Sequence, residues 1–188
     1  GAVHAQNALA AALAAHALGY AGDAIRRGLA AFVGVPGRFE VVARAPLVIV
    51  DYAHTPDGLA GTLATARALG ARVICVFGCG GNRDRGKRPE MGAVADGAAD
   101  TVVLTTDNPR HEDPEAIAAE ILTGAPAPRA RWIVELDRAR AIELALALAR
   151  PADIVVIAGK GHERVQEIAG AALPFSDADV VRAVTTRR

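Results

Sequence analysis

The chain has 188 residues, of which 52% are hydrophobic and 22% are charged, and its 21 basic residues balance its 21 acidic ones. This composition suits an α/β domain with a substantial core and excludes a polycation that attracts nucleic acid through its net charge. No apolar run approaches the ~18 residues of a membrane-spanning helix, so neither nucleic acid nor a membrane is expected as a partner. Two cysteines in or beside an apolar run favour free thiols over a disulfide, and we expect a cytoplasmic monomer.

The first 36 residues are helical in pattern and differ from the rest of the chain. Residues 4–17 predict an alanine-rich helix, and residues 23–32 predict a second helix that ends at the Gly-Val-Pro-Gly run of 34–37. Two helices are too few for a domain, and the chain starts with neither Met nor a preceding strand. We therefore expect residues 1–36 to be the end of a preceding domain, and residues 37–188 to form a domain of their own.

Residues 37–188 alternate between apolar strand-like runs and helical runs, a pattern typical of a doubly wound, mostly parallel, Rossmann-like sheet of about six strands. The strand-like runs are nearly continuous in Val, Ile and Leu, which indicates a sheet covered on both faces. Residues 163–175 predict a short hairpin. The expected strands are 39–43, 47–51, 72–78, 101–105, 131–135 and 153–158, and the expected helices are 56–69, 89–98, 114–122, 137–149 and 177–186.

Four polar loops follow the predicted strands, at 51–57, 78–89, 106–114 and 159–163. The carboxyl ends of parallel strands share one edge of a sheet, where open α/β folds bind their ligands. We therefore expect one polar crevice lined by all four loops.

Two strings in these loops imitate known catalytic motifs. Gly81-x4-Gly86-Lys87 follows the phosphate-loop pattern until Arg88, which stands where Ser or Thr would coordinate magnesium. Asp51 and His54 could act as orienter and general base, but no Ser or Cys nucleophile sits in an elbow motif nearby. We assign no catalytic residue and no metal ligand in this chain.

The loop at 106–114 carries groups suited to a zwitterionic ligand. Arg110 could grip a carboxylate bidentately, and Asn108 could donate or accept a hydrogen bond beside it. The run Asp113-Pro114-Glu115 leaves an alternative open, in which the acids merely begin a helix. For His54 and His162 the alternative is a hydrogen-bonded loop histidine without a ligand.

Five motifs, in this order and spacing, resemble the C-terminal domain of the Mur ligases, and in particular of the members that add diaminopimelate. They are PGRFE, DYAHTPD, GCGGNRDRGKRP, DNPRHEDP and GKGHE. Residues 1–36 resemble the end of the central ATPase domain of that family, including the Asn-Ala-Leu-Ala-Ala run at 7–11. His4 stands where the family usually has Asn, which leaves the role of that position open.

The resemblance implies an ATP-dependent ligase of peptidoglycan synthesis. Such an enzyme activates UDP-MurNAc-L-Ala-D-Glu as an acyl phosphate and joins it to meso-diaminopimelate, with ATP and Mg²⁺ as cofactors. The family's phosphate loop, magnesium ligands and nucleotide-binding N-terminal domain would lie upstream of residue 1, so we expect this chain alone to be inactive. The alternatives are a ligase that adds L-lysine and a stand-alone, non-catalytic amino-acid-binding domain.

The resemblance also implies roles for individual residues. Arg110 would bind the distal carboxylate of diaminopimelate, which L-lysine lacks, and Glu163 would bind the distal ammonium. The alternative for Glu163, without a ligand, is a solvated salt bridge with Lys160 or Arg164. The expected diaminopimelate-binding residues are Arg83, Asn108, Arg110, Gly159 and Glu163, and the expected ATP-binding residues are Asn7, Arg38, Asp51 and His54.

Overall fold

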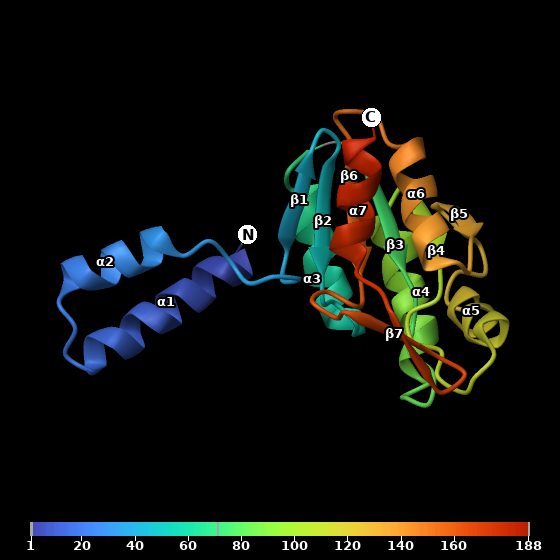
Figure 1. Cartoon of the computed structure of the whole chain (residues 1–188), viewed down its shortest axis with the longest axis horizontal. Helices are drawn as coiled ribbons and strands as arrows, with labels where there is room; N and C mark the ends of the chain where they lie inside the picture. Colours follow the sequence, from blue (N-terminus) through green and yellow to red (C-terminus); the bar gives the residue numbers. More distant parts are fainter. Residues whose placement is uncertain (1, 71, 188) are drawn as a thin grey trace. The chain divides into compact units, whose positions relative to one another are not determined.

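A computed structural model describes residues 2–70 and 72–187, with side chains from residue 5 onward. The chain divides into two compact units, Gly1–Gly34 and Val35–Arg188 (Figure 1). This boundary lies two residues before the expected one. The assignment of the first unit to the end of an ATPase domain stays a prediction.

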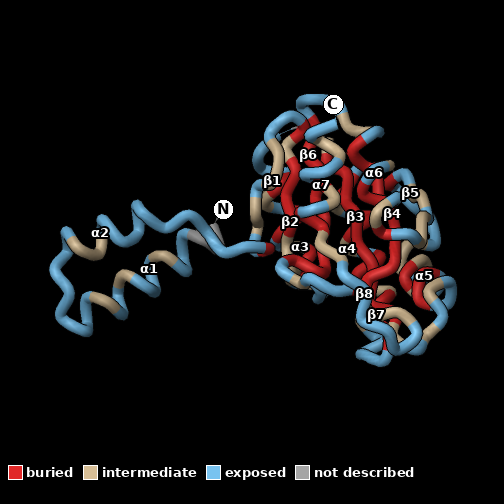
Figure 2. Tube along the Cα trace, viewed as in Figure 1, coloured by how far each residue is buried: buried red, intermediate tan, exposed pale blue. Residues whose placement is uncertain are grey.

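The first unit is the expected helix pair, α1 (Ala2–Ala17) and α2 (Gly22–Ala31). Its large apolar side chains remain exposed, among them Leu9, Leu13 and Phe32, and α2 has no buried residue (Figure 2). Two helices alone offer too little surface to bury such side chains.

The second unit is built on a six-stranded sheet in the order β1-β2-β6-β3-β4-β5. Five strands are parallel, and β1 runs antiparallel to β2 at one edge, so the prediction of a mostly parallel sheet is confirmed. The strands are β1 (Glu40–Arg44), β2 (Leu47–Asp51), β3 (Val73–Phe77), β4 (Thr101–Leu104), β5 (Arg131–Val134) and β6 (Ile154–Ala158).

Helices cover both faces of this sheet. They are α3 (Pro56–Arg67), α4 (Lys87–Ala98), α5 (Pro114–Leu122), α6 (Arg138–Leu148) and α7 (Asp177–Thr186). Ile49 of β2 belongs to the core cluster that includes buried residues of α3, α4 and α5, whereas its neighbours Val48 and Val50 belong to the cluster of α6 and α7. Successive strand residues thus face opposite layers, as a doubly wound fold requires. None of the described helices is long and apolar enough to cross a bilayer.

The helices begin where the polar loops end, and the loops supply the caps. Thr55 accepts a hydrogen bond from the Gly58 amide, and Asp113 accepts one from the Glu115 amide. Helix α4 begins at Lys87, two residues earlier than expected. Pro89 therefore lies in its first turn, where the missing N–H costs no helical hydrogen bond.

A separate two-stranded hairpin follows β6, as the pattern at 163–175 predicted. Its strands are β7 (Val165–Ile168) and β8 (Ala171–Pro174). Strand β7 runs beside the loop after β4: the Arg110 amide donates to the Glu167 carbonyl at 3.0 Å, and the Ala169 amide donates to the Arg110 carbonyl at 2.6 Å. The hairpin is thereby fixed against the loop that contains Asn108 and Arg110.

One fully buried ion pair joins α6 to α7. Arg138 donates from Nε and Nη2 to the two carboxylate oxygens of Asp177, each at 2.8 Å, and both side chains have no exposed surface. The same guanidinium donates to the Ala158 carbonyl at the end of β6, at 3.0 Å. The pair therefore connects two helices to the carboxyl edge of the sheet.

We predict that Arg138→Met lowers the free energy of unfolding by about 3–5 kcal/mol, because Asp177 would be left as a buried charge without its partner. The double variant Arg138→Met/Asp177→Leu should regain most of that loss. Urea unfolding followed by the fluorescence of Trp132, the only tryptophan, measures both. A double variant as unstable as the single one would show that the ion pair itself, and not the orphaned charge, sets the cost.

Candidate functional site

The four polar loops meet at the carboxyl edge of the sheet, as expected. The Gly81 amide donates to the Asn108 carbonyl at 2.8 Å, which joins the loops after β3 and β4. The Gly159 amide donates to the Asp51 carbonyl at 3.1 Å, which joins the loops after β6 and β2. A Cβ atom at Gly81 would overlap the Pro109 carbonyl oxygen, so this position requires glycine.

Asn108 and Glu163 come together around Lys160. The Lys160 ammonium donates to Asn108 Oδ1 and to Glu163 Oε2, each at 2.8 Å, and Asn108 Nδ2 donates to the same Glu163 oxygen at 2.8 Å. Burial opposes the charge of Glu163, but these two hydrogen bonds outweigh it and hold the pKa of that carboxyl below its ordinary value.

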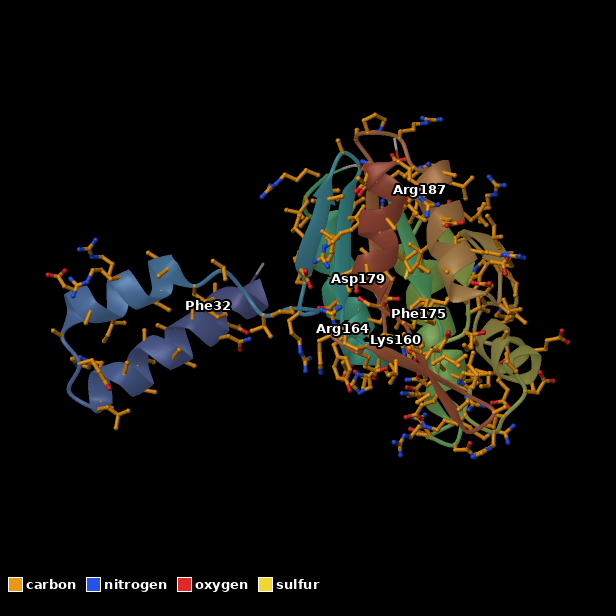
Figure 3. The ribbon with its side chains drawn as sticks, in the orientation of Figure 1. Phe32, Lys160, Arg164, Phe175, Asp179 and Arg187 are labelled. Atoms are coloured by element: carbon orange, nitrogen blue, oxygen red, sulfur yellow. The ribbon has the colours of Figure 1, made fainter. Side chains whose placement is uncertain are left out.

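The alternative for Glu163, a solvated salt bridge with Lys160 or Arg164, is therefore only partly correct. Glu163 does pair with Lys160, but Lys160 is fully buried, so this is not a solvated surface pair. Arg164, the residue after Glu163, is exposed and pairs instead with Asp179 at 2.7 Å (Figure 3).

Arg110 lies in the loop after β4, two residues beyond Asn108, with a backbone φ of 54°. Its Nη1 donates to the Gly81 carbonyl at 2.8 Å, and its Nε lies 2.8 Å from Glu167 Oε2. A guanidinium has five N–H donors, so three have no partner among the described residues. The side chain is anchored at one end and still able to bind a carboxylate.

Arg83 and Gly159 are also placed by the loops around the crevice. Arg83 is exposed, and it flanks Gly80 together with Arg110. Gly159 has φ of 116°, and a Cβ atom there would lie 2.5 Å from Asp107 Oδ2. The glycine is thus required by the close approach of Asp107, a protein contact that its expected ligand role did not anticipate.

Asp51 is engaged by its own surroundings. Its Oδ1 accepts from the Ala53 amide at 3.0 Å and from Thr62 Oγ1 at 2.8 Å, and its Oδ2 accepts from the Phe39 amide at 2.6 Å. An ionised carboxylate has about four acceptor positions, so roughly one remains for a ribose hydroxyl.

Arg38 and His54 meet through Tyr52, a residue that the sequence did not single out. The Arg38 guanidinium lies 4.6 Å from the centre of the Tyr52 ring, and the His54 ring lies 4.6 Å from it. Asn7 is exposed on α1 in the first unit, so its part in a nucleotide site stays a prediction. His4 lies outside the side chains that the structure describes.

A second buried cation, Arg88, joins the loops after β3 and β4. Its guanidinium donates to Glu112 at 2.9 and 3.0 Å, to Glu120 at 2.8 Å, and to the Gly80 carbonyl at 3.2 Å. This explains why the residue after Gly86-Lys87 is not a phosphate-loop Ser or Thr. The run Asp113-Pro114-Glu115 does begin a helix, with Asp113 as the cap of α5 and Glu115 in its first turn, whereas Glu112 serves as an ion-pair partner.

The described residues hold no group of three or more His, Cys, Asp and Glu side chains that could bind a metal ion. Cys75 and Cys79 are both buried free thiols, and burial raises the pKa of each to about 12. Neither thiol is therefore activated as a nucleophile at neutral pH.

Residues 37–161 match the family model of the Mur ligase glutamate ligase domain. This match covers more than half of the chain and shows, together with the doubly wound fold, that the chain belongs to the Mur ligase family. Within that family it is similar to enzymes named UDP-N-acetylmuramoyl-L-alanyl-D-glutamate–2,6-diaminopimelate ligase. It is 54% identical to that of Alkalilimnicola ehrlichii over 96% of the chain, and 48% identical to that of Neisseria meningitidis over the whole chain.

Solved structures agree with these relatives. A structure of a diaminopimelate ligase of the same name is 42% identical and superposes with a TM-score of 0.75 over 98% of this chain and 38% of that one. E. coli FolC in complex with ADP is 25% identical, with a TM-score of 0.68 over 97% of this chain and 39% of that one. The chain spans only 36% of the A. ehrlichii enzyme and 39% of the N. meningitidis enzyme.

The ion pair of Arg88 and Glu112 makes a prediction about acid stability. Hydrogen bonds from Arg88 and from the Asn82 amide lower the pKa of Glu112 to about 2. A lowered pKa stabilises the fold at pH values above the ordinary glutamate value, and this stabilisation is lost as the pH falls from there through about 2. Glu112→Gln should therefore cost about 1–3 kcal/mol at pH 7 and progressively less on acidification.

Urea unfolding between pH 7 and pH 3 tests this expectation. The matched control is Glu143→Gln, which changes an exposed glutamate on α6 and should leave the stability nearly unchanged at every pH. A loss that is the same at pH 3 as at pH 7 would contradict an origin in the charge of Glu112.

Proposed function

We propose that this chain is the amino-acid-binding part of an ATP-dependent ligase that joins meso-diaminopimelate to UDP-MurNAc-L-Ala-D-Glu in peptidoglycan synthesis. One observation carries the proposal: a partly free guanidinium, Arg110, and a partly free carboxylate, Glu163, are fixed on two loops that are hydrogen-bonded to each other. The names of the relatives support it, because both the A. ehrlichii and the N. meningitidis enzymes are diaminopimelate ligases.

The distal end of diaminopimelate carries one carboxylate and one ammonium group. The free N–H donors of Arg110, with Arg83 on the other side of Gly80, suit the carboxylate. Glu163 Oε1 has no partner among the described residues and suits the ammonium, whereas the second Nδ2 hydrogen of Asn108 is a donor and suits a carboxylate oxygen of the ligand. The loop after β4 thus presents a cation and the loop after β6 presents an anion, and these opposite charges would orient the ligand.

ATP suits the neighbouring face formed by Arg38, Asp51 and His54 of the second unit. The ATP contact of Asn7, in the first unit, stays a separate prediction from the family resemblance. Arg38 would neutralise phosphate, and the remaining acceptor position of Asp51 would take a ribose hydroxyl. ATP supplies the phosphoryl group that activates the D-glutamyl carboxylate, and Mg²⁺ would be held by residues outside this chain. We infer that the chain binds and orients substrates in the cytoplasm as part of a monomeric enzyme, and that it is inactive alone.

Two alternatives remain distinct from this proposal. An L-lysine-adding ligase would have no ligand group for Arg110, because lysine lacks the distal carboxylate. A stand-alone amino-acid-binding domain would bind its ligand without an upstream partner and would take part in no amide synthesis.

We predict that Arg110→Ala weakens diaminopimelate binding by about 2–4 kcal/mol, because the distal carboxylate loses its charge partner, and weakens L-lysine binding far less. The measurement is the KM of both amino acids in a chimeric ligase, in which the preceding part of the A. ehrlichii enzyme is joined to this chain. The chain without that part is expected to show no turnover, because it lacks the groups that handle the transferred phosphoryl.

Arg164→Ala is the matched control, since it removes an exposed arginine of the adjacent loop. It should leave both KM values nearly unchanged. Equal losses for diaminopimelate and lysine in the Arg110 variant would mean that Arg110 holds the loop and not the ligand. Turnover by the isolated chain would overturn its assignment as a partial enzyme.

A further inference from the structure

Lys160 is a fully buried ammonium in the loop directly after β6, and Figure 3 labels it. A buried lysine is costly unless its charge is paired and its N–H groups are hydrogen-bonded. Both of its partners, Asn108 and Glu163, belong to the proposed amino-acid site, and they come from two different loops. Such a residue is placed to control that site without touching the ligand.

The first control concerns the orientation of the Asn108 amide. Its Oδ1 accepts from the Lys160 ammonium at 2.8 Å and from the Glu167 amide at 3.0 Å. Two donors converge on this atom, so it must be the oxygen: a flipped amide would point its own N–H groups at an ammonium and a backbone N–H. Lys160 therefore keeps Asn108 Nδ2 directed at Glu163.

The second control concerns the Glu163 carboxylate. Lys160 and Asn108 both donate to Oε2, which leaves Oε1 without a partner among the described residues. The carboxylate is thus held by one oxygen and offers the other. Without Lys160, a single neutral amide would hold it, and the side chain, 29% exposed, would be free to rotate into water.

The third control is electrostatic. Asp107, which is 7% exposed, lies close enough to interact with Lys160 and Glu163. The buried pair of Arg138 and Asp177 interacts with Asp107, and Arg138 also interacts with Glu163. This group holds two cations and three carboxyl groups. Replacing Lys160 by a neutral residue would leave one cation against three carboxyl groups, which favours protonation or displacement of Glu163.

We propose that Lys160 is a positioning residue of the amino-acid site: it fixes the Asn108 amide so that Nδ2 donates to Glu163, and it holds the Glu163 carboxylate by Oε2 so that Oε1 receives the ligand ammonium. This inference rests on the proposed function, since it assigns the ligand to the same crevice. It adds a residue that acts only through two others, so its effect must depend on them.

The test uses the whole chain, labelled with ¹⁵N and ¹³C, and compares wild type with Lys160→Met, which keeps the length of the side chain and removes its charge and donors. In the free protein, NMR should show a shifted or broadened Asn108 side-chain amide and a higher titration midpoint of the Glu163 carboxyl in the variant. Titration with meso-diaminopimelate should show an affinity lowered about tenfold or more.

Two comparisons separate positioning from general destabilisation. Arg72→Met removes a partly buried cation that pairs with Asp153 at 2.7 Å before β3 and β6, at the opposite edge of the sheet, and it should leave all three readouts unchanged. In a double-mutant cycle, the losses of Lys160→Met and Glu163→Gln should not add, because Lys160 acts through Glu163. Lys160→Gln, which keeps a donor but no charge, replaces the Met variant if that one does not fold.

The outcomes distinguish this inference from the proposed function. If wild-type chain shows no response to meso-diaminopimelate, the proposed function loses its support, while the Asn108 and Glu163 signals still decide whether Lys160 positions them. Unchanged Asn108 and Glu163 signals in the Lys160 variant would overturn the positioning role. Additive losses in the cycle would overturn it as well.

Discussion

The guanidinium of Arg138 fixes the place where the two amino-acid-binding loops begin. It pairs with Asp177 and donates to the Ala158 carbonyl at the end of β6, and its Nη1 lies 3.4 Å from the Thr106 carbonyl after β4. Asn108 and Lys160 each follow one of these carbonyls by two residues. One buried guanidinium, bonded to the start of both loops, therefore sets the distance between them and with it the geometry of the site.

The general architecture was predictable because it depends on local patterns. Continuous apolar strands, their alternation with helices and the helix start at Asp113 are each visible within a single segment of the sequence. The spacing of the five motifs carried the family resemblance. The hairpin at 163–175 was also expected, although its position against Arg110 was not, since that contact joins segments far apart in the sequence.

The buried cations were not predictable in the same way. Arginine and lysine usually lie at the protein surface, so the sequence gives no sign that Arg88 and Lys160 are buried. Only the tertiary structure reveals that Glu112, Glu120 or Asn108 surrounds them. Glu163 illustrates the limit well. Its partner Lys160 lies only three residues away, so the sequence alone suggests the pair. Whether that pair is solvated or part of a buried network depends on how deeply β6 places Lys160.

The close approach of Gly37 to the loop after β6 has a mechanical consequence. A Cβ atom at Gly37 would overlap the backbone of Gly161 and His162, and the Phe39 amide is bonded to Asp51, so the chain is fastened to the second unit from residue 37 onward. Gly34, with φ of 98° and open space around it, is not restrained in this way. Within the second unit, the backbone at Gly37 and the loop that carries Lys160 and Glu163 are therefore in direct contact. A displacement of one would require a displacement of the other.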